Sequence, residues 1–352
     1  MIKNLKVPTV SKKKFTLSSF SGQIDGSLDN EVKGDFALDY AFNFSAKDGT
    51  LKCDDGLKLL TIDNKGLSFS DGVKAEIIFY YNRFDTINKK KDDRIVAYAN
   101  DGGIYSLKLY DDSTNFTKIE GITFTEKPSF LSYKSYDDDV LLLSTKKDGL
   151  YILNGDEITF VDGAPSITSM CIHSERLFIT TDSDENTVWF SDDFDLTNWF
   201  VSLDEAGYIT LADSRGKMLQ VFSFLNYLFV FREYGISRIT AYGSQEDFSV
   251  DNLYSGHGKI YKNSITFCGN SIIFLASDGV YKFNGVECVK TLKEFDNYLK
   301  GVDNFDCFGI YFDGELKLSL NAKIDGKIQK IILPWNYLFV CLFEFTTGRC
   351  CI

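Results

Sequence analysis

Apolar and polar residues alternate along this chain in a pattern typical of paired β-strands. Five segments each contain an apolar stretch, a polar turn and a second apolar stretch. Alternation of this kind, bounded by Gly, Asn and Asp, predicts a β-hairpin. The five predicted hairpins span 94–109, 140–155, 176–192, 227–243 and 271–285.

One phrase occurs twice in nearly the same letters, as "DGLYILNG" and "DGVYKFNG". In both copies an Asp-Gly turn precedes a strand with a tyrosine, and an Asn-Gly turn closes it. Repetition of a short unit is the first sign of a repeat architecture. The repeated turn residues are Asp148, Gly149, Tyr151, Asn154 and Gly155, matched by Asp278, Gly279, Tyr281, Asn284 and Gly285.

The repeat period identifies the architecture. The second strands of the five hairpins align on Tyr105, Tyr151, Trp189, Ser237 and Tyr281, with steps of 46, 38, 48 and 44 residues. Roughly 40–50 residues is the length of one four-stranded blade of a β-propeller. With further strands expected in 308–322 and 327–345, we predict an all-β propeller of six four-stranded blades, with seven as the alternative.

Two regions are expected to depart from this regular pattern. Residues 1–35, which include the basic "SKKK" at 11–14, are predicted as an extended N-terminal arm or a closing strand, and 36–352 as the propeller domain. A frayed terminus is the alternative for the arm. The segment 291–302 predicts a helix with Leu292, Phe295 and Leu299 on one face and Gly301 as its stop.

Composition and charge exclude several partners. The chain has 352 residues, 38 basic and 50 acidic side chains, and a net charge of −12. Binding a phosphate backbone over a broad face needs clustered Lys and Arg, so we predict no sequence-specific nucleic-acid binding. An acidic surface can still border a passage through which DNA slides. The sequence contains neither the apolar run of a signal peptide nor a membrane span, which predicts synthesis in the cytoplasm and no membrane insertion.

The eight cysteines are scattered without a CxxC pair, and we expect them to be free and mostly buried. Residues 182–193 contain part of a metal-binding pattern. Asp182, Asp184 and Asn186 have the alternate spacing that begins a calcium loop, but Thr187 stands where the loop needs Gly and Asp193 where it needs Glu. A solvated turn is therefore the preferred interpretation of 182–193, with a calcium site as the alternative.

Catalytic motifs are not evident. His173 and His257 lie in no metal-binding spacing, and the seven arginines show no triad spacing. The stretch "SDDFDLTNW" resembles the Asp-box turn of sialidase-type propellers through Ser191, Asp193 and Trp199, but this turn stabilises the fold and is distant from catalysis. Without a Gly-rich phosphate loop or a GxSxG elbow, we predict a non-enzymatic protein with no cofactor and no catalytic residue.

Four segments resemble the propellers of bacteriophage virions. The run 20–60 is similar to their N-terminal motif, and 188–199, 208–243 and 256–285 are similar to their central turns and strands. The matching residues are Gly22, Asn43, Asp48, Gly49, Leu51 and Gly56 in the first segment, and Trp189, Ser191, Asp192 and Trp199 in the second. The basic residue that usually lies near the second glycine is shifted or lost, as Lys52 and Asp54 indicate.

This resemblance implies a structural protein of the particle, similar to the tail-hub or DNA-stabilisation proteins of short-tailed phages. Such a protein would assemble in the host cytoplasm as a homo-oligomeric ring, contact portal, tail or adaptor proteins at the head–tail connection, and help to retain packaged DNA. Arms such as 1–35 and the charged run 88–94 would then be contact candidates, with solvated surface as the alternative for the run.

Two other functions are compatible with the residues. The first is a glycan- or receptor-binding propeller in which exposed Trp199 and Trp335 stack on sugars. The second is a glycoside hydrolase or lyase of the same fold, whose carboxylate pair would be recognised by separation in space and not in sequence.

Overall fold

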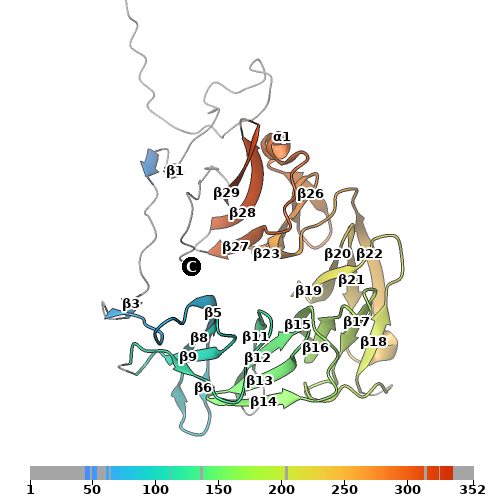
Figure 1. The fold of residues 1–352 in the computed structure, drawn as a ribbon. Coiled ribbons are helices and arrows are strands. Elements are labelled where there is room, and N and C mark those ends of the chain that lie inside the picture. The colour runs from blue at the N-terminus through green and yellow to red at the C-terminus, as the bar shows by residue number, and fades with distance from the viewer. Residues whose placement is uncertain are drawn as a thin grey trace, which may run out of the picture.

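Six antiparallel sheets follow one another around a common axis in the computed structural model of the protein (Figure 1). The structure describes residues 44–47, 50–53, 61–62, 65–111, 113–134, 138–202, 205–312, 315–324 and 326–335. Five sheets have four strands, and the described part of the sixth has three. The fold is therefore a six-bladed β-propeller, which confirms the predicted class and the predicted blade number.

Within each blade the strands pair in chain order, from an inner strand at the axis to the rim. Blade 1 contains β5 (Ala75–Tyr81), β8 (Arg94–Ala99), β9 (Ile104–Lys108) and β10 (Thr117–Lys118). Blade 2 contains β11 (Ser129–Lys134), β12 (Asp139–Thr145), β13 (Gly149–Asn154) and β14 (Glu157–Val161). Blade 3 contains β15 (Ser169–His173), β16 (Arg176–Thr180), β17 (Thr187–Phe190) and β18 (Gly207–Thr210).

The second half of the ring repeats this order. Blade 4 contains β19 (Met218–Phe224), β20 (Tyr227–Arg232), β21 (Gly235–Thr240) and β22 (Ser249–Ser255). Blade 5 contains β23 (Thr266–Cys268), β24 (Ser271–Ala276), β25 (Gly279–Phe283) and β26 (Cys288–Thr291). Blade 6 contains β27 (Phe308–Phe312), β28 (Glu315–Ile324) and β29 (Lys327–Trp335).

Short pairs and single-turn helices complete the described elements. The pairs are β1 (Phe44–Lys47) with β2 (Thr50–Cys53), β3 (Thr61–Ile62) with β4 (Lys65–Gly66), and β6 (Phe84–Asp85) with β7 (Lys90–Lys91). The 3-10 helices are η1 (Gln245–Asp247) and η2 (Lys262–Ser264). The predicted arm at 1–35 lies outside the described residues, as does the part of the expected strand segment 327–345 that follows Trp335.

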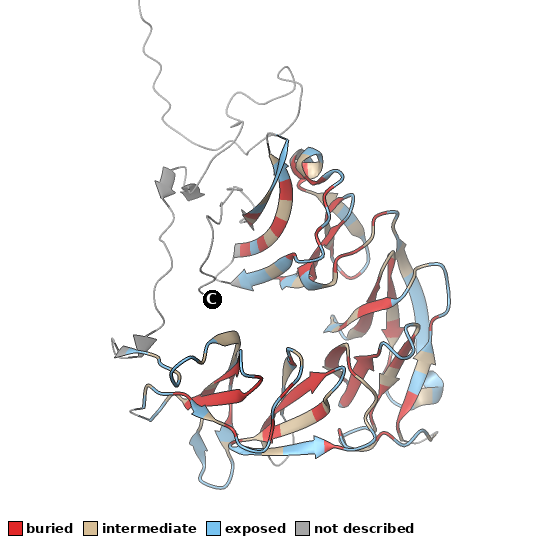
Figure 2. Ribbon diagram, in the orientation of Figure 1, coloured by how far each residue is buried: buried red, intermediate tan, exposed pale blue. Residues whose placement is uncertain are grey.

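The five hairpins predicted from the sequence are the middle strands of blades 1 to 5. These are the pairs β8–β9, β12–β13, β16–β17, β20–β21 and β24–β25. Middle strands are covered by neighbouring blades on both faces, so their side chains are buried almost without interruption. The rim strand β14 is largely exposed. Figure 2 shows this change from buried middle strands to exposed rim strands.

The core is divided into layers between blades. Phe229 and Phe231 of blade 4 pack with Phe274 and Phe283 of blade 5, and all four are fully buried. Their rings meet edge to face, with centroids 5.1 Å apart for Phe229 and Phe283 and 5.5 Å for Phe231 and Phe274. A blade buries its faces against its neighbours, which is why the repeat must close around an axis.

Antiparallel order gives the propeller two distinct faces. Inner strands begin at one face, here called the leading face, and end at the other, called the trailing face. The turns between first and second strands and between third and fourth strands therefore lie on the trailing face. The turns between second and third strands, and the links between blades, lie on the leading face. The two Asp-Gly turns are thus on the leading face and the two Asn-Gly turns on the trailing face.

The predicted helix at 291–302 is shorter than expected. The strand β26 continues to Thr291, and Leu292 has a left-handed backbone with φ of 51°. A 3-10 turn, η3 (Lys293–Phe295), and the one-turn helix α1 (Asp296–Leu299) follow. The predicted apolar face is confirmed, because Leu292, Phe295 and Leu299 are buried in the same cluster. Among the described residues, no helix is long and apolar enough to cross a membrane.

Candidate functional site

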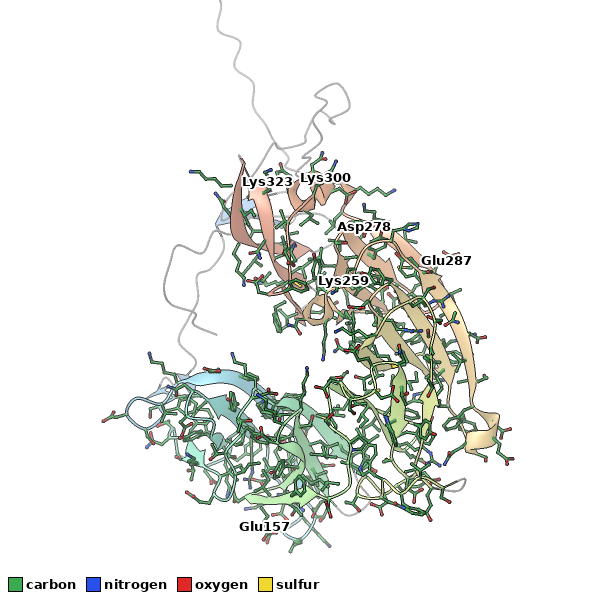
Figure 3. The ribbon with its side chains drawn as sticks, turned by 45° about the vertical axis from the view of Figure 1, so that its right-hand side comes forward. Glu157, Lys259, Asp278, Glu287, Lys300 and Lys323 are labelled. Carbon is green, nitrogen blue, oxygen red and sulfur yellow. The ribbon has the colours of Figure 1, made fainter. Side chains whose placement is uncertain are left out.

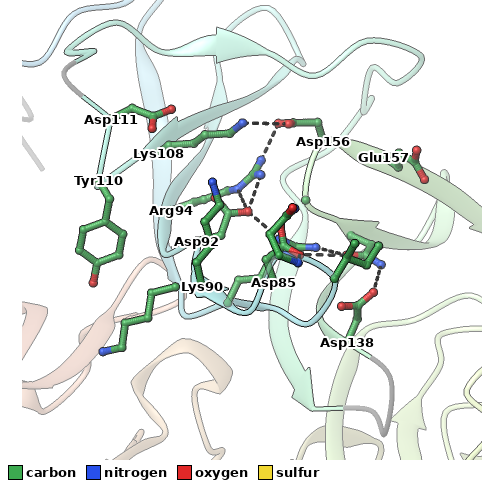
Figure 4. Close-up of a pocket in the computed structure, with 16 residues that line it drawn as sticks. Asp85, Lys90, Asp92, Arg94, Lys108, Tyr110, Asp111, Asp138, Asp156 and Glu157 are labelled. Carbon is green, nitrogen blue, oxygen red and sulfur yellow. Dashed lines mark hydrogen bonds and ion pairs between the residues drawn. The ribbon is translucent and has the colours of Figure 1, made fainter.

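A polar cavity of about 590 Å³ opens on the trailing face between blades 1 and 2 (Figure 4). We call it the rim pocket. Its walls are the β6–β7 hairpin with the residues just after it, the turn that follows β9, and the turn at 154–157 between β13 and β14. The predicted turn residues Asn154 and Gly155 therefore belong to this pocket, beside charged side chains from the other blade.

Two buried arginines organise the pocket. The guanidinium of Arg94, 3% exposed, lies 2.6 Å from a carboxylate oxygen of Asp92 and 2.5 Å from one of Asp156. Arg83 approaches the same oxygen of Asp92 at 2.7 Å. Asp92 thus bridges two guanidinium groups, and Asp156 on blade 2 accepts a charge-assisted hydrogen bond from blade 1. The blades are joined here by ion pairs as well as by apolar packing.

Asn154 extends this network. Its side-chain oxygen accepts hydrogen bonds from Arg83 Nη2 at 2.8 Å and from Arg83 Nε at 3.3 Å. Its amide nitrogen donates to Asp138 at 2.9 Å, and Thr86 donates to the same carboxylate at 2.7 Å. Gly155 has a left-handed backbone with φ of 63°, and a Cβ there would be in ordinary contact with Arg94 Nη2 at 3.4 Å. The asparagine of the Asn-Gly turn therefore serves as a hydrogen-bond acceptor for blade 1.

Hydrogen bonds and ion pairs favour the ionised form of two carboxylates in the pocket. Hydrogen bonds from Asn154 and Thr86 hold the pKa of Asp138 below its usual range. Burial acts to raise the pKa of Asp156, but the hydrogen bonds and charges of Arg94 and Lys108 outweigh it and lower the pKa. Below the pocket, burial raises the pKa of Tyr81 to about 12, and its hydroxyl donates to the carbonyl oxygens of Asp139 and Leu153. Each of these pKa values is shifted further from neutral pH, so these groups are poorly suited to general acid–base catalysis.

Two tyrosines lie next to the network. Tyr80 and Tyr110 donate hydrogen bonds to the same carboxylate oxygen of Asp93, at 2.9 and 2.8 Å. Asp93 also accepts from the backbone N–H of Arg83 at 3.1 Å. Tyr110 lines the pocket and is 62% exposed, so one aromatic face remains accessible beside polar groups. This combination of ring and hydrogen-bonding side chains is the pocket's best feature for ligand recognition.

Sequence reasoning missed most of this site. Asp92 and Arg94 lie in the charged run 88–94, for which solvated surface was one interpretation, yet Arg94 is among the most buried charged residues described. Arg83 and Asn154 are 71 positions apart, and no local pattern connects them. The signal that could have found Arg94 is its place as the first residue of an apolar strand, β8, next to residues that are buried.

The structure places the two copies of the repeated phrase in different blades. Asp148 precedes β13 of blade 2, which begins at Gly149, and Asp278 precedes β25 of blade 5, which begins at Gly279. Figure 3 shows Asp278 and Glu287, which lie beyond opposite ends of β25, and Glu157 far away in blade 2. The copies are therefore not parts of one site, and the rim pocket contains residues of the first copy alone.

The Asp-box-like residues are structural. The hydroxyl of Ser191 is buried, accepts from the N–H of Leu177 at 3.0 Å and donates to the carbonyl of Asp192 at 2.8 Å. Asp193 is exposed, 3.8 Å from Arg176. The sugar-stacking role considered for Trp199 is wrong, because Trp199 is buried and its indole N–H donates to Leu196 at 3.1 Å. The side chain of Trp335 is not among those that the structure describes.

The remaining candidates stay apart from one another. Asp182, in the calcium-like turn, accepts a hydrogen bond from Ser166 at 2.9 Å. Within the described ranges, no group of three or more His, Cys, Asp or Glu side chains could hold a metal ion.

His173 is buried, which lowers its pKa, and shares a 2.9 Å hydrogen bond with Ser223. His257 is exposed. Cys171, Cys268 and Cys307 are free and buried, as predicted, and Cys288 is free and half-buried.

Comparison with known proteins gives similarity of fold. No family model and no curated protein matches the sequence. YCF48 from Cyanidioschyzon merolae shares 12% identity over 65% of this chain and 76% of its own, with a TM-score of 0.43. Raptor from Chaetomium thermophilum shares 10% over 74% of this chain and 24% of its own, with a TM-score of 0.44. Kluyveromyces lactis Hsv2 shares 9% over 75% and 91%, with a TM-score of 0.40.

Proposed function

We propose that the protein is a non-enzymatic structural component of a phage or prophage particle. In this role it is a tail-hub or head-completion propeller that assembles through protein–protein contacts near the portal and helps to retain packaged DNA. The placement in a virion is supported by the sequence resemblance over residues 20–285. The mode of action, assembly through surfaces, is supported by how exposed apolar residues are distributed.

The observation that carries the proposal is the apolar character of the trailing face. Ile87, Phe200, Tyr242 and Val286 are 69–86% exposed and occupy trailing-face turns of blades 1, 3, 4 and 5. The turns between second and third strands, on the leading face, are instead composed mainly of Asp, Ser, Lys, Asn and Gly. Single exposed apolar residues are ordinary, but their repetition on one face favours a surface that a protein partner covers.

The partners would be other virion proteins, with further copies of this chain in a ring around the tail axis. The net charge of −12 is consistent with a ring that borders a DNA passage, because it repels the phosphate backbone. The rim pocket fits the same role, since its two buried arginines are paired internally with Asp92 and Asp156 and do not form a basic surface.

The test measures solution mass by size-exclusion chromatography with light scattering, for the chain alone and with the portal and tail proteins encoded beside it. We expect a ring, or a complex that forms when a partner is added. A Tyr242→Ser, Val286→Ser double variant should weaken the association at least about tenfold. The control is Phe305→Ser, which removes a 65% exposed aromatic ring on the leading face and should leave assembly unchanged.

Three outcomes contradict the proposal. One is a stable monomer that ignores its neighbours, and another is equal association of the double variant and the wild type. The third concerns the particle: virions that lack the protein but are assembled and infectious would show that it is not a structural component. Release of reducing sugars from host envelope would contradict the non-enzymatic part.

A second candidate function is glycan or receptor binding at the rim pocket, favoured by the exposed ring of Tyr110 beside carboxylate and amide groups. Aromatic rings and planar polar groups together suit sugars. Retention on a column of host-wall glycan, abolished by soluble sugar and by Tyr110→Ala, would support this function. Unretarded passage of the wild type would exclude it.

A further inference from the structure

A second cavity, of about 360 Å³, lies at the propeller axis near the leading face. It is lined by residues at the beginning of the inner strands or just before them, and all six blades contribute. We call it the axial cavity. It does not overlap the rim pocket, and neither the structural role nor glycan binding uses it. Its volume falls within the range of small-molecule sites, at the small end.

The axial cavity contains one charged side chain among its described lining residues, Lys262. This lysine lies in η2, just before blade 5, and its ammonium donates a hydrogen bond to the carbonyl oxygen of Thr168, just before blade 3. The side chain therefore reaches between two non-adjacent blades. Burial and, to a lesser extent, the charge of Lys146 lower the pKa of Lys262 to about 8. A half-buried cation without a carboxylate partner is costly for a fold to retain.

Two carboxamides accompany the cation. Gln220 lies at an irregularity in β19, where the register shifts between Met218 and Gln220, and Asn263 follows Lys262 directly. Both line the axial cavity. In the described structure neither side chain hydrogen-bonds to another residue, so their N–H donors are available. A bulge that turns a side chain toward a cavity is common beside binding sites.

The rest of the wall is apolar. Phe79 and Phe130, from the inner strands of blades 1 and 2, stack with ring centroids 5.5 Å apart. Phe308, at the start of β27, lines the cavity from blade 6 and is exposed despite its size. The cavity thus joins one ammonium and two amide donors to an aromatic wall. Such a surface complements a ligand with an anionic end and an apolar body.

We propose that the axial cavity binds a small organic carboxylate, with its anionic oxygens on Lys262, Gln220 and Asn263 and its apolar part against Phe79 and Phe130. The carboxylate supplies a counter-ion, which the ammonium does not find among the described residues. A neutral molecule of the same shape leaves the cation unpaired and binds less well. This inference is independent of the proposed virion role, because it concerns a different face and a different kind of partner.

The experiment uses benzoate as the anionic probe and benzamide as its neutral isostere, with the full chain at neutral pH. Binding is followed by isothermal titration and by saturation-transfer NMR. We expect saturable binding of benzoate below about 10 mM, and at least about tenfold weaker binding of benzamide. The variant Lys262→Met keeps the aliphatic stem and removes the charge, so it should lose at least about tenfold in benzoate affinity.

Two further variants test the assignment. Gln220→Leu should weaken benzoate binding by severalfold. This variant still tests the site if Lys262→Met does not fold. Lys147→Met is the matched control, because this lysine is exposed and pairs with Glu126 away from the axial cavity. It should keep benzoate affinity within about twofold. Absence of saturable benzoate binding, equal affinity for benzamide, or undiminished binding by Lys262→Met or Gln220→Leu would overturn the proposal.

Discussion

The stretches 148–155 and 278–285 occupy equivalent places in blades 2 and 5. Each places its tyrosine opposite the second strand of its blade, Tyr151 against Leu143 and Tyr281 against Phe274. In each, the glycine of the Asp-Gly turn and the glycine of the Asn-Gly turn have positive φ. The backbone is therefore repeated, but the polar side chains make different contacts.

The asparagines differ most. Asn154 bonds to Arg83 of blade 1 and to Asp138, and so couples two blades. Asn284 accepts from the N–H groups of Val286 at 3.0 Å and Glu287 at 2.8 Å, and so closes its own turn. Asparagine suits both tasks, because its short amide can bond to the local backbone or turn outward. The neighbouring blade decides which task is used.

The aspartates differ in the same way. Asp148 accepts from the N–H of Thr125 at 2.9 Å and from the hydroxyl of Thr145 at 2.8 Å, which ties its turn to the link from blade 1. Asp278 accepts from the hydroxyl of Tyr281, three positions later in its own strand, at 2.7 Å. A repeated sequence phrase thus specifies a repeated backbone, while its side chains remain free for different uses.

The largest difference between the copies is expected at their first glycines. Gly279 has φ of 146°, and a Cβ there would lie 2.3 Å from Lys290 Cε and 2.8 Å from Asp296 Oδ1. Gly279→Ala should therefore cost about 3 kcal/mol of unfolding free energy. In the control Gly149→Ala, φ is 88° and the nearest atom belongs to the ring of Phe160 on the exposed rim strand, so the cost should be about 1–2 kcal/mol. Denaturant titration measures both, and equal costs would contradict the comparison.

The asparagines provide the next test. Asn154→Ala removes one acceptor from Arg83 and one donor to Asp138 in a half-buried network, and we expect a loss of about 2 kcal/mol. Asn284→Ala removes an exposed turn interaction and should cost about 0.5–1 kcal/mol. Urea denaturation of the two variants measures the difference. If Asn284→Ala were the more costly change, the interblade role of Asn154 would be refuted.

Substitution of the two tyrosines is expected to lower the free energy of unfolding by a smaller amount. Burial and the hydrogen bond to Asp278 raise the pKa of Tyr281, whereas the hydroxyl of Tyr151 has no hydrogen bond to any residue that the structure describes. Tyr281→Phe should therefore cost about 1 kcal/mol and Tyr151→Phe less than about 0.5 kcal/mol. Thermal denaturation measures both. A reversed order would mean that Tyr151 finds a polar partner in solution.

The smallest effect concerns acid stability. Burial acts to raise the pKa of Asp148, but hydrogen bonds from Thr125 and Thr145 lower it below its ordinary 3.8. The stability that this group contributes is present above that ordinary value and is lost as the pH falls through the lower folded value. Asp148→Asn should flatten the acid limb of the stability curve, compared with Asp278→Asn. Unfolding titrations at a series of acidic pH values measure the slopes, and parallel curves would contradict the assignment.

Local patterns were sufficient for the blades and insufficient for the sites. Alternation and turn residues predicted the middle strands, because each hairpin closes within a few residues and is buried as a unit. The rim pocket depends on Arg83 and Asn154, which meet only after blades 1 and 2 have packed. Trp199 was misjudged for the same reason, since it is buried in an apolar cluster formed by residues of blades 2 and 3. The predicted helix at 291–302 was too long because β26 continues to Thr291 and Leu292 has a left-handed backbone.

The joints between blades respond differently to their surroundings. Between blades 4 and 5 the phenyl rings of Phe229 and Phe283 are dry, and such contacts weaken on cooling. At the rim pocket, Lys108 and Asp156 form a 3.2 Å ion pair that faces water, and added salt screens it. Cold therefore weakens one joint between blades and high ionic strength weakens another, so the solvent conditions determine which joint weakens first.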